Sequence, residues 1–196
     1  MKQINNSINK RNIQDIIFKC VLYTVVGILV KILPHSLCMT PLNNFYLHTG
    51  SKFSKMITIT IVVLSMLIGD VILSRLYNYP IFGWWSLFTY SGFIFISFLG
   101  SQISSNCSRN KLIVCIISTS LLFWIWTNFG AWLLISNYPK NLSGLITCYI
   151  MALPFLKAAL FSDLVWSLIV FYPVYWHRSS LTYNHVHYAF SKKIQT

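Results

Sequence analysis

Long apolar stretches, each close to 20 residues, are the feature that most constrains how this chain can fold. Four of them lie at 56–74, 86–103, 112–135 and 156–176, and a fifth at 13–33 is interrupted by two lysines. About 20 apolar residues in an α-helix span the hydrocarbon core of a bilayer. Hydrophobic residues make up 56% of the chain and charged residues 9%, against roughly 25% charged in a soluble domain. The sequence therefore predicts an all-α, polytopic membrane protein.

The stretch 37–50 is short and partly polar, so the basic residues must decide whether it crosses the membrane. If it crosses, eleven lysines and arginines lie on the cytoplasmic side and four outside. If it does not, the later loops exchange sides and the division becomes seven against eight. Because basic residues gather on the cytoplasmic side of membrane proteins, we predict about six transmembrane helices, a short second one among them, with both termini in the cytoplasm.

The same pattern divides the chain into three parts. They are a polar cytoplasmic N-terminal tail at 1–12, a single helical membrane domain at 13–176 and a basic cytoplasmic C-terminal tail at 177–196. Within the membrane domain, a turn signal followed by an apolar run and then Pro154 predicts a short interfacial helix at about 143–153, along the outer surface. The last span is then expected to start at Pro154.

Carboxylates inside the apolar stretches are rare and mark the place where function is expected. The chain has three acidic residues, and two of them, Asp70 and Asp163, lie inside apolar stretches. A charge in hydrocarbon is costly, so such residues usually face a bundle interior, a partner or a wet cavity. At 1.5 Å per residue, Asp70 lies roughly 7 Å, Asp163 roughly 9 Å and Asn128 about 12 Å from the outer ends of their spans. This predicts one cavity that opens outward.

A polar and aromatic stripe in the fifth span supports this cavity. Ser120, Trp124, Asn128 and Trp132 recur every four residues, so they share one helix face and can offer hydrogen bonds and stacking surfaces together. His35, in a predicted outer loop, can cap the cavity, although a lone loop histidine is often simply solvated. The predicted substrate-binding residues are therefore Asp70, Asn128, Trp132, Asp163, His35 and Trp124.

Structural interpretations of the same residues remain open. Asp70 can pair with Arg75, although five residues is a poor helical offset. Asp163 can be neutral, or paired with Lys157. Asn128 can join two helices by hydrogen bonding, a frequent task of asparagine in membrane bundles. Mid-depth tryptophans can also be core packing.

Several function classes are disfavoured by what the sequence lacks. It has no Gly-rich phosphate loop, no nucleophile elbow and no zinc-type histidine spacing, so we predict no enzyme, no metal site and no cofactor. Five cysteines without C-x-x-C spacing are expected to be small buried hydrophobes. The net charge of +12 comes from basic residues at the ends of apolar segments, which favours anionic lipid as partner over nucleic acid.

Short motifs along the chain resemble a known family. They are Leu33-Pro34-His35, Thr40-Pro41, Gly69-Asp70, Thr127-Asn128-Phe129-Gly130-Ala131-Trp132, Ala152-Leu153-Pro154-Phe155 and Asp163-Leu164. Over roughly 28–172, their order resembles an uncharacterised family of small bacterial integral-membrane proteins. That family is similar in architecture to the substrate-binding S components of energy-coupling-factor (ECF) transporters. The resemblance implies a six-helix domain with an outward ligand pocket, whose import function needs a separate transmembrane scaffold and ATPase subunits.

The chain departs from that family at two motifs. It has Cys38-Met39 where the family has an Asn-Phe pair, and Lys157-Ala158-Ala159 where the family has Arg-Asn-Thr. Two polar side chains are thus missing, which implies a ligand that is altered or lost. Two functions stay open: an S-component-like module for uptake of a small solute across the bacterial cytoplasmic (inner) membrane, or a noncatalytic membrane assembly or scaffold protein.

Overall fold

The regular elements in the described part of the chain are all α-helices, and several of them are long enough to cross a membrane. A computed structural model describes residues 2–33, 41–78, 80–103 and 107–172, with side chains from residue 13 onward. Its helices are α1 (Lys2–Ile32), α2 (Leu42–Lys52), α3 (Lys55–Tyr77), α4 (Trp84–Gly100), α5 (Arg109–Leu134) and α6 (Leu142–Val170). Ile13–Ile32 of α1, and α3, α5 and α6, are long and apolar enough to be membrane spans. This confirms an all-α, polytopic membrane fold.

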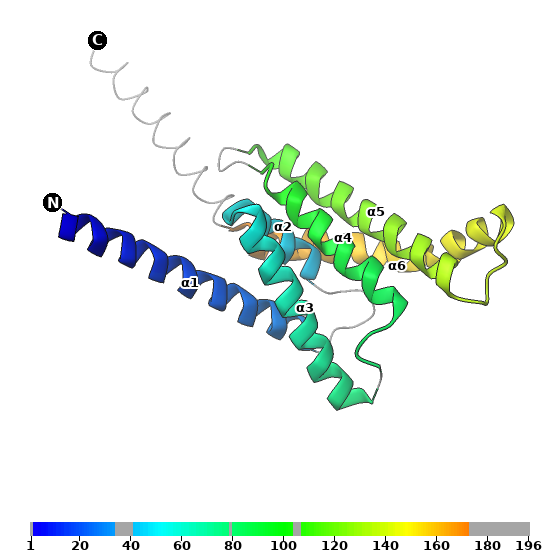
Figure 1. Cartoon of the computed structure of the whole chain (residues 1–196). Coiled ribbons are helices and arrows are strands. Elements are labelled where there is room, and N and C mark those ends of the chain that lie inside the picture. Colours follow the sequence, from blue (N-terminus) through cyan, green and yellow to red (C-terminus); the bar gives the residue numbers. More distant parts are fainter. Residues whose placement is uncertain (1, 34–40, 79, 104–106, 173–196) are drawn as a thin grey trace, which may run out of the picture.

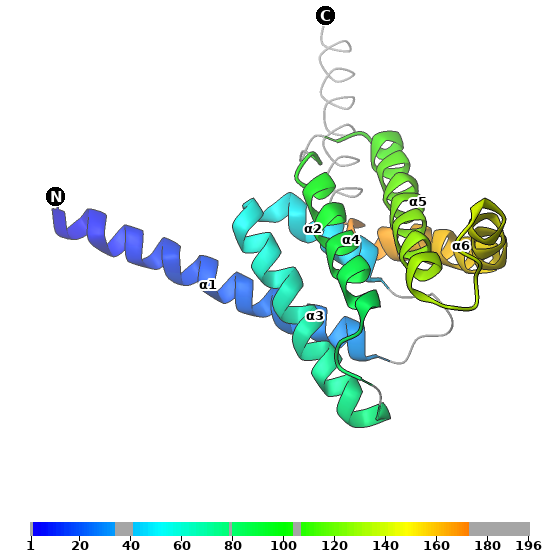
Figure 2. The same ribbon diagram turned by 45° about the vertical axis from the view of Figure 1, so that its right-hand side comes forward.

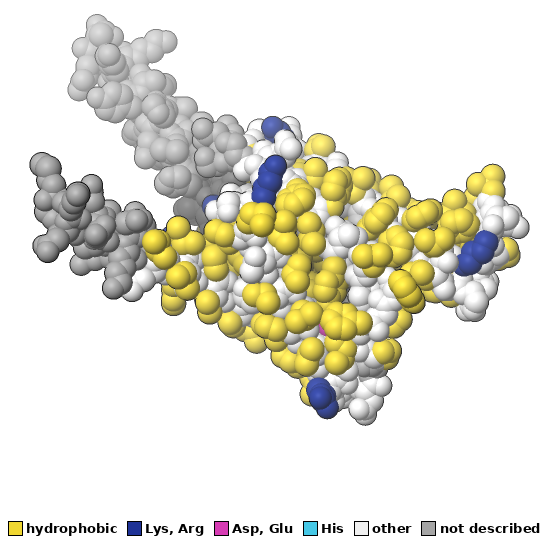
Figure 3. Space-filling view, in the orientation of Figure 1, with side chains coloured by type: hydrophobic (Ala, Val, Ile, Leu, Met, Phe, Trp, Pro, Cys, Tyr) yellow, Lys and Arg dark blue, Asp and Glu magenta, His cyan; other side chains and the backbone are white. Residues whose placement is uncertain are grey.

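The outer surface of the bundle is apolar, as expected for contact with lipid. Phe18, Trp84 and Leu168 each expose more than half of their surface. Figure 3 shows hydrophobic side chains over most of the visible face, while the lysines and arginines lie at its extremities. α4 is also apolar but has only 17 residues, or about 26 Å of helix. α4 can therefore cross the bilayer with only slight local thinning of the hydrocarbon core.

Capping side chains and one left-handed residue mark several of the helix ends. The side chain of Ser108 accepts a hydrogen bond from the backbone N–H of Lys111 (3.3 Å), which caps α5. Asn141 caps α6 in the same way through the N–H of Gly144 (2.9 Å). α3 ends at Asn78, whose φ of 53° places it in the left-handed region that asparagine tolerates better than most residues.

α1 and α3 run side by side in the same direction (Figures 1 and 2). Gly27 of α1 lies against Ser65 of α3. One turn further along both helices, Lys31 of α1 lies against Gly69 of α3, so the two helices are parallel. Since both helices are long enough to span the membrane, the chain must return across it between Ile32 and Lys55. α2 makes this return inside the bundle, which agrees with the predicted short second crossing.

α2 is a short, partly polar helix that the other helices enclose. Tyr46 and Leu47 are fully buried. Its backbone lies directly against α4, because a Cβ on Gly50 would come within 1.7 Å of the Ser97 carbonyl oxygen and one on Gly100 within 2.0 Å of the Leu47 carbonyl oxygen. Eleven residues cover about 16 Å, only about half of the hydrocarbon thickness. Protein rather than lipid therefore surrounds this crossing.

The predicted interfacial helix at 143–153 is not a separate element. α6 is continuous from Leu142 to Val170, with Pro154 inside it. Its first part packs against α5, where the Tyr149 hydroxyl donates a hydrogen bond to the Ile125 carbonyl oxygen (2.8 Å). Proline is tolerated within membrane helices because neighbouring helices and side chains can satisfy the freed backbone groups. The prediction of a helix break at Pro154 is therefore wrong.

The structure describes most of the predicted N-terminal tail but not the predicted C-terminal tail. α1 begins at Lys2, so residues 2–12 of the predicted N-terminal tail form the first part of a long helix. The predicted tail 177–196 lies outside the described residues, as does the loop residue His35.

Candidate functional site

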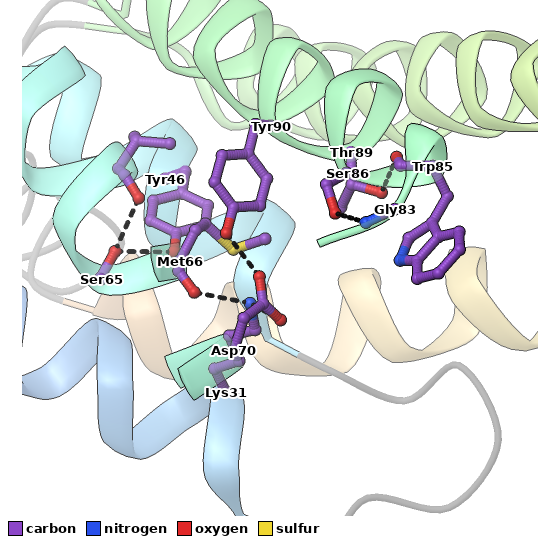
Figure 4. A network of polar contacts seen from close by, with 11 residues as sticks. Lys31, Tyr46, Ser65, Met66, Asp70, Gly83, Trp85, Ser86, Thr89 and Tyr90 are labelled. Carbon is purple, nitrogen blue, oxygen red and sulfur yellow. Dashed lines mark hydrogen bonds and ion pairs between the residues drawn. The ribbon is translucent and has the colours of Figure 1, made fainter. Parts of the chain in front are cut away.

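Asp70 belongs to an ion pair between α1 and α3. Its Oδ1 lies 2.6 Å from the Lys31 Nζ, and the two side chains are only 14% and 9% exposed. The Tyr90 hydroxyl of α4 donates to Asp70 Oδ2 (2.5 Å), and Lys31 also donates to the Met66 carbonyl oxygen (2.9 Å). Figure 4 shows these groups converging. The pairing is thus with Lys31 of a neighbouring helix and not with Arg75.

This pair changes the interpretation of Asp70. Lysine and aspartate cancel each other's charge, and the tyrosine and the backbone carbonyl satisfy further hydrogen bonds of the two side chains. A buried pair of this kind holds helices in register. Because one oxygen of Asp70 is paired with Lys31 of α1 and the other accepts from Tyr90 of α4, we assign Asp70 to the packing of three helices.

Asp163 forms a second and different polar centre, which we call the Asp163 centre. It comprises Asp163 of α6, Ser120 of α5, and Asn43 and Asn44 in the first turn of α2. Asp163 Oδ2 accepts from Asn43 Nδ2 (2.9 Å) and Ser120 Oγ (2.5 Å). Asn44 Nδ2 donates to the backbone oxygen (2.8 Å) and Oδ1 (3.3 Å) of the same residue. Asp163 is 2% exposed and Asn44 is 1% exposed.

The partners of Asp163 are neutral. Two amides and one hydroxyl surround it, and the predicted alternative of an ion pair with Lys157 is not found, since the ion pair among the described residues is that of Lys31 and Asp70. The first turn of α2 contributes the partial positive charge of a helix N-terminus. These groups offset part of the negative charge without neutralising it.

Unsatisfied acceptors lie around this centre. Among the described residues, three buried side-chain oxygens have no hydrogen-bond partner: Asn43 Oδ1, Asn44 Oδ1 and Ser162 Oγ. Two of them belong to the amides that hold Asp163, and the third belongs to its neighbour in sequence. Buried acceptors without a donor are destabilising, so a polar occupant would stabilise this region.

Two members of the stripe predicted on the fifth span, Ser120 and Trp124, lie on the face of α5 that meets α6. Ser120 contacts Asp163, the Trp124 Nε1–H donates to the Ala152 carbonyl oxygen (3.0 Å), and the Trp132 Nε1–H donates to the Pro139 carbonyl oxygen (3.0 Å). Asn128 donates to the Trp124 carbonyl oxygen of its own helix (2.8 Å). Ser120 and Trp124 therefore face the same neighbouring helix, and three of the four polar groups already have backbone partners.

The structure does not bring all predicted site residues into one hollow. Asp70 and Asp163 have no hydrogen-bond partner in common. Ser120, which holds Asp163, lies eight residues from Asn128 along α5, or about 12 Å. A surface hollow of about 410 Å³ between α4 and α5 has apolar walls that include Phe95 and Trp126. The single outward cavity is therefore replaced by two separate polar centres.

Sequence reasoning missed the partners of both carboxylates. Lys31, Tyr90, Asn43 and Asn44 were not predicted as site residues. The available signal for the asparagines was their position in the short polar stretch, because two adjacent amides in a buried helix need hydrogen-bond partners. Lys31 offered a similar signal, since a lysine in an apolar run requires an acceptor.

Comparison with known proteins identifies the family. Residues 11–185 match a family model described as a family of unknown function, DUF6580. The chain belongs to the DUF6580 family. The match spans from within α1 past the end of α6, so the DUF6580 region contains most of α1 and all of α2 to α6. No curated protein and no solved structure matches the chain.

Proposed function

We propose that this multi-pass membrane protein is an S-component-like module that binds a small solute for uptake, with Asp163 at the binding centre. One observation carries the proposal: a carboxylate buried within a membrane-spanning helix is surrounded by neutral amides and a hydroxyl, and the amide oxygens beside it lack donors. Polar groups at membrane depth are retained mainly where they serve a pathway or a site.

The proposed chemistry is binding without covalent steps. Asp163, Asn43, Asn44 and Ser120 offer a carboxylate, two amides and a hydroxyl, which suit a solute that donates hydrogen bonds. Asn128 and Trp132 lie farther along the same face of α5 and stay predicted contacts on the solute's path. His35 stays a predicted capping residue. Asp70 is not included among the proposed binding residues, because it forms an ion pair with Lys31.

The orientation we propose follows from the basic residues at the helix ends. Lys52 and Lys55 flank the connection from α2 to α3, and Arg109 and Lys111 begin α5, at the same end of the bundle. Basic residues favour the cytoplasmic side, so this end and both termini face the cytoplasm of a bacterial inner membrane. Energy for uptake comes from a partner with a transmembrane scaffold and ATPase subunits.

A noncatalytic assembly or scaffold protein is the second candidate. It is favoured by the Lys31 and Asp70 pair, which joins two helices, and by the exposed apolar face of α1, which packs mainly against α3. In that case both polar centres would serve packing, and the exposed face of α1 would contact another membrane protein.

Replacing Asp163 distinguishes the two candidates. We expect native mass spectrometry of the wild-type protein to detect a co-purified small molecule whose removal lowers the unfolding temperature. Asp163→Asn is expected to lose this molecule but insert normally. Asp15→Asn is the matched control, because Asp15 is an exposed acid on α1 and its replacement is expected to retain the molecule. The assembly function predicts instead that Asp163→Asn loses folded protein or a partner protein, with no small molecule in any variant.

A further inference from the structure

The two buried carboxylates differ in charge balance. Asp70 has a lysine ammonium group 2.6 Å away, so the pair is neutral as a whole. Asp163 is more deeply buried, but its side-chain partners are the neutral groups of Asn43, Asn44 and Ser120. An unpaired charge is costly at membrane depth, so the Asp163 centre favours an occupant that brings positive charge.

The free groups at this centre are acceptors. Asn43 donates one hydrogen bond to Asp163 and Asn44 donates two, while the oxygens Oδ1 of both amides are buried and have no donor. The hydroxyl of Ser120 has one proton and two acceptors within reach, Asp163 Oδ2 and the Ile116 carbonyl oxygen. The centre therefore has more acceptors than protons to satisfy them.

The donor set restricts the occupant further. Its ligand atoms are all oxygens, which suit hard cations rather than soft transition metals. Among the described residues there is also no group of three or more His, Cys, Asp or Glu side chains. A divalent ion would leave excess positive charge beside a single carboxylate, and an anion would be repelled by it.

We infer that the Asp163 centre binds a small monovalent cation, either an alkali metal ion or a small ammonium group. The cation neutralises Asp163 and contacts the free oxygens of Asn43 and Asn44. This inference rests on the proposed function, because it names the chemistry that the same centre accepts: the solute is itself a cation, or a cation binds with it. The N-terminus of α2 offsets part of the carboxylate charge, and the cation supplies the remainder.

Cation titration of the purified protein tests the inference. The unfolding temperature is measured in NaCl, KCl or NH₄Cl, with choline chloride added to hold the total salt constant. We expect a saturable rise with at least one of the three salts, since a ligand that binds only the folded state stabilises it. Asp163→Asn is expected to abolish this rise, Asn43→Ala to raise the half-saturating concentration at least tenfold, and Asp15→Asn to leave it unchanged.

The other outcomes separate the failure of this inference from the failure of the proposed function. Identical unfolding temperatures in all four salts mean that Asp163 serves only to hold α2 against α6 through its hydrogen bonds with Asn43 and Asn44. A rise that persists in Asp163→Asn places the cation elsewhere. If Asp163→Asn does not fold, an unchanged half-saturating concentration in Asn43→Ala is equally decisive. If a solute co-purifies but no salt raises the unfolding temperature, the proposed function stands and the cation inference fails. If a salt raises the unfolding temperature but no solute co-purifies, the cation inference stands and the proposed uptake function fails.

Discussion

At the scale of single residues, the pair of Lys31 and Asp70 explains why a membrane helix can contain a lysine and an aspartate. Each residue alone would be a buried charge in an apolar segment. The hydroxyl of Tyr90 and the carbonyl of Met66 complete the hydrogen bonding of the pair. Removing one partner is therefore expected to be worse than removing both.

A double-mutant cycle tests this pair. We expect Lys31→Met to lower the free energy of unfolding by about 3 kcal/mol, because it leaves Asp70 charged and unpaired. Adding Asp70→Leu is expected to recover most of this loss, since two apolar side chains need no counter-charge. Unfolding in detergent, followed by circular dichroism, measures both changes.

The control for the cycle is Arg75→Met. Arg75 is exposed near the end of α3, so its replacement should change stability by less than about 0.5 kcal/mol. A large loss with Arg75→Met and none with Lys31→Met would mean that Asp70 pairs within its own helix, contrary to the structure.

At the scale of helices, α2 is the unusual element, because it is short, polar and buried. Its close contact with α4 depends on two glycines, Gly50 and Gly100, at which the backbones meet. Small residues allow membrane helices to approach in this way, and the resulting van der Waals packing replaces the hydrophobic effect that is absent in lipid. The position of Asn43 and Asn44 under Asp163 depends on this packing.

Gly50→Ala tests the contact. Its Cβ would lie 1.7 Å from the Ser97 carbonyl oxygen, so α2 and α4 must separate, and we expect a loss of about 3 kcal/mol in stability. Ser101→Ala, at an exposed position just after α4, is the control and should be nearly neutral. Thermal unfolding and size-exclusion chromatography report the result. Equal stability of the two variants would contradict the close packing.

The positions of the helices could be predicted from the sequence better than the contacts that their buried polar residues make. Apolar length located five of the helices, and the distribution of basic residues indicated that the short polar segment crosses. The break at Pro154 was wrong because a proline signal is local, whereas continuity of α6 depends on its packing against α5. Asp70 and Asp163 were recognised as buried, but their partners depend on which helices lie side by side, and a single sequence does not contain that information.

At the scale of the whole molecule, the parallel course of α1 and α3 determines which helix connections lie at each end of the bundle. The connections that precede α3 and α5 lie at one end, and those that follow them lie at the other. Under the proposed orientation, the first end faces the cytoplasm.

Cysteine labelling tests this orientation. In a variant without the five native cysteines, single cysteines replace exposed basic residues at either end. Arg75→Cys and Lys140→Cys are expected to react with a membrane-impermeant maleimide in intact cells. Lys52→Cys and Lys111→Cys are expected to react only after permeabilisation, because they lie at the end richer in basic residues. The reverse pattern would place the termini outside.

The enclosed position of α2 has a consequence for biosynthesis. A short segment with several polar side chains has little tendency to leave the translocation channel for lipid on its own. The groove that receives it is completed by α4, which the ribosome makes later. Insertion of this protein is therefore expected to be cooperative, with the second crossing held near the channel until the fourth helix emerges.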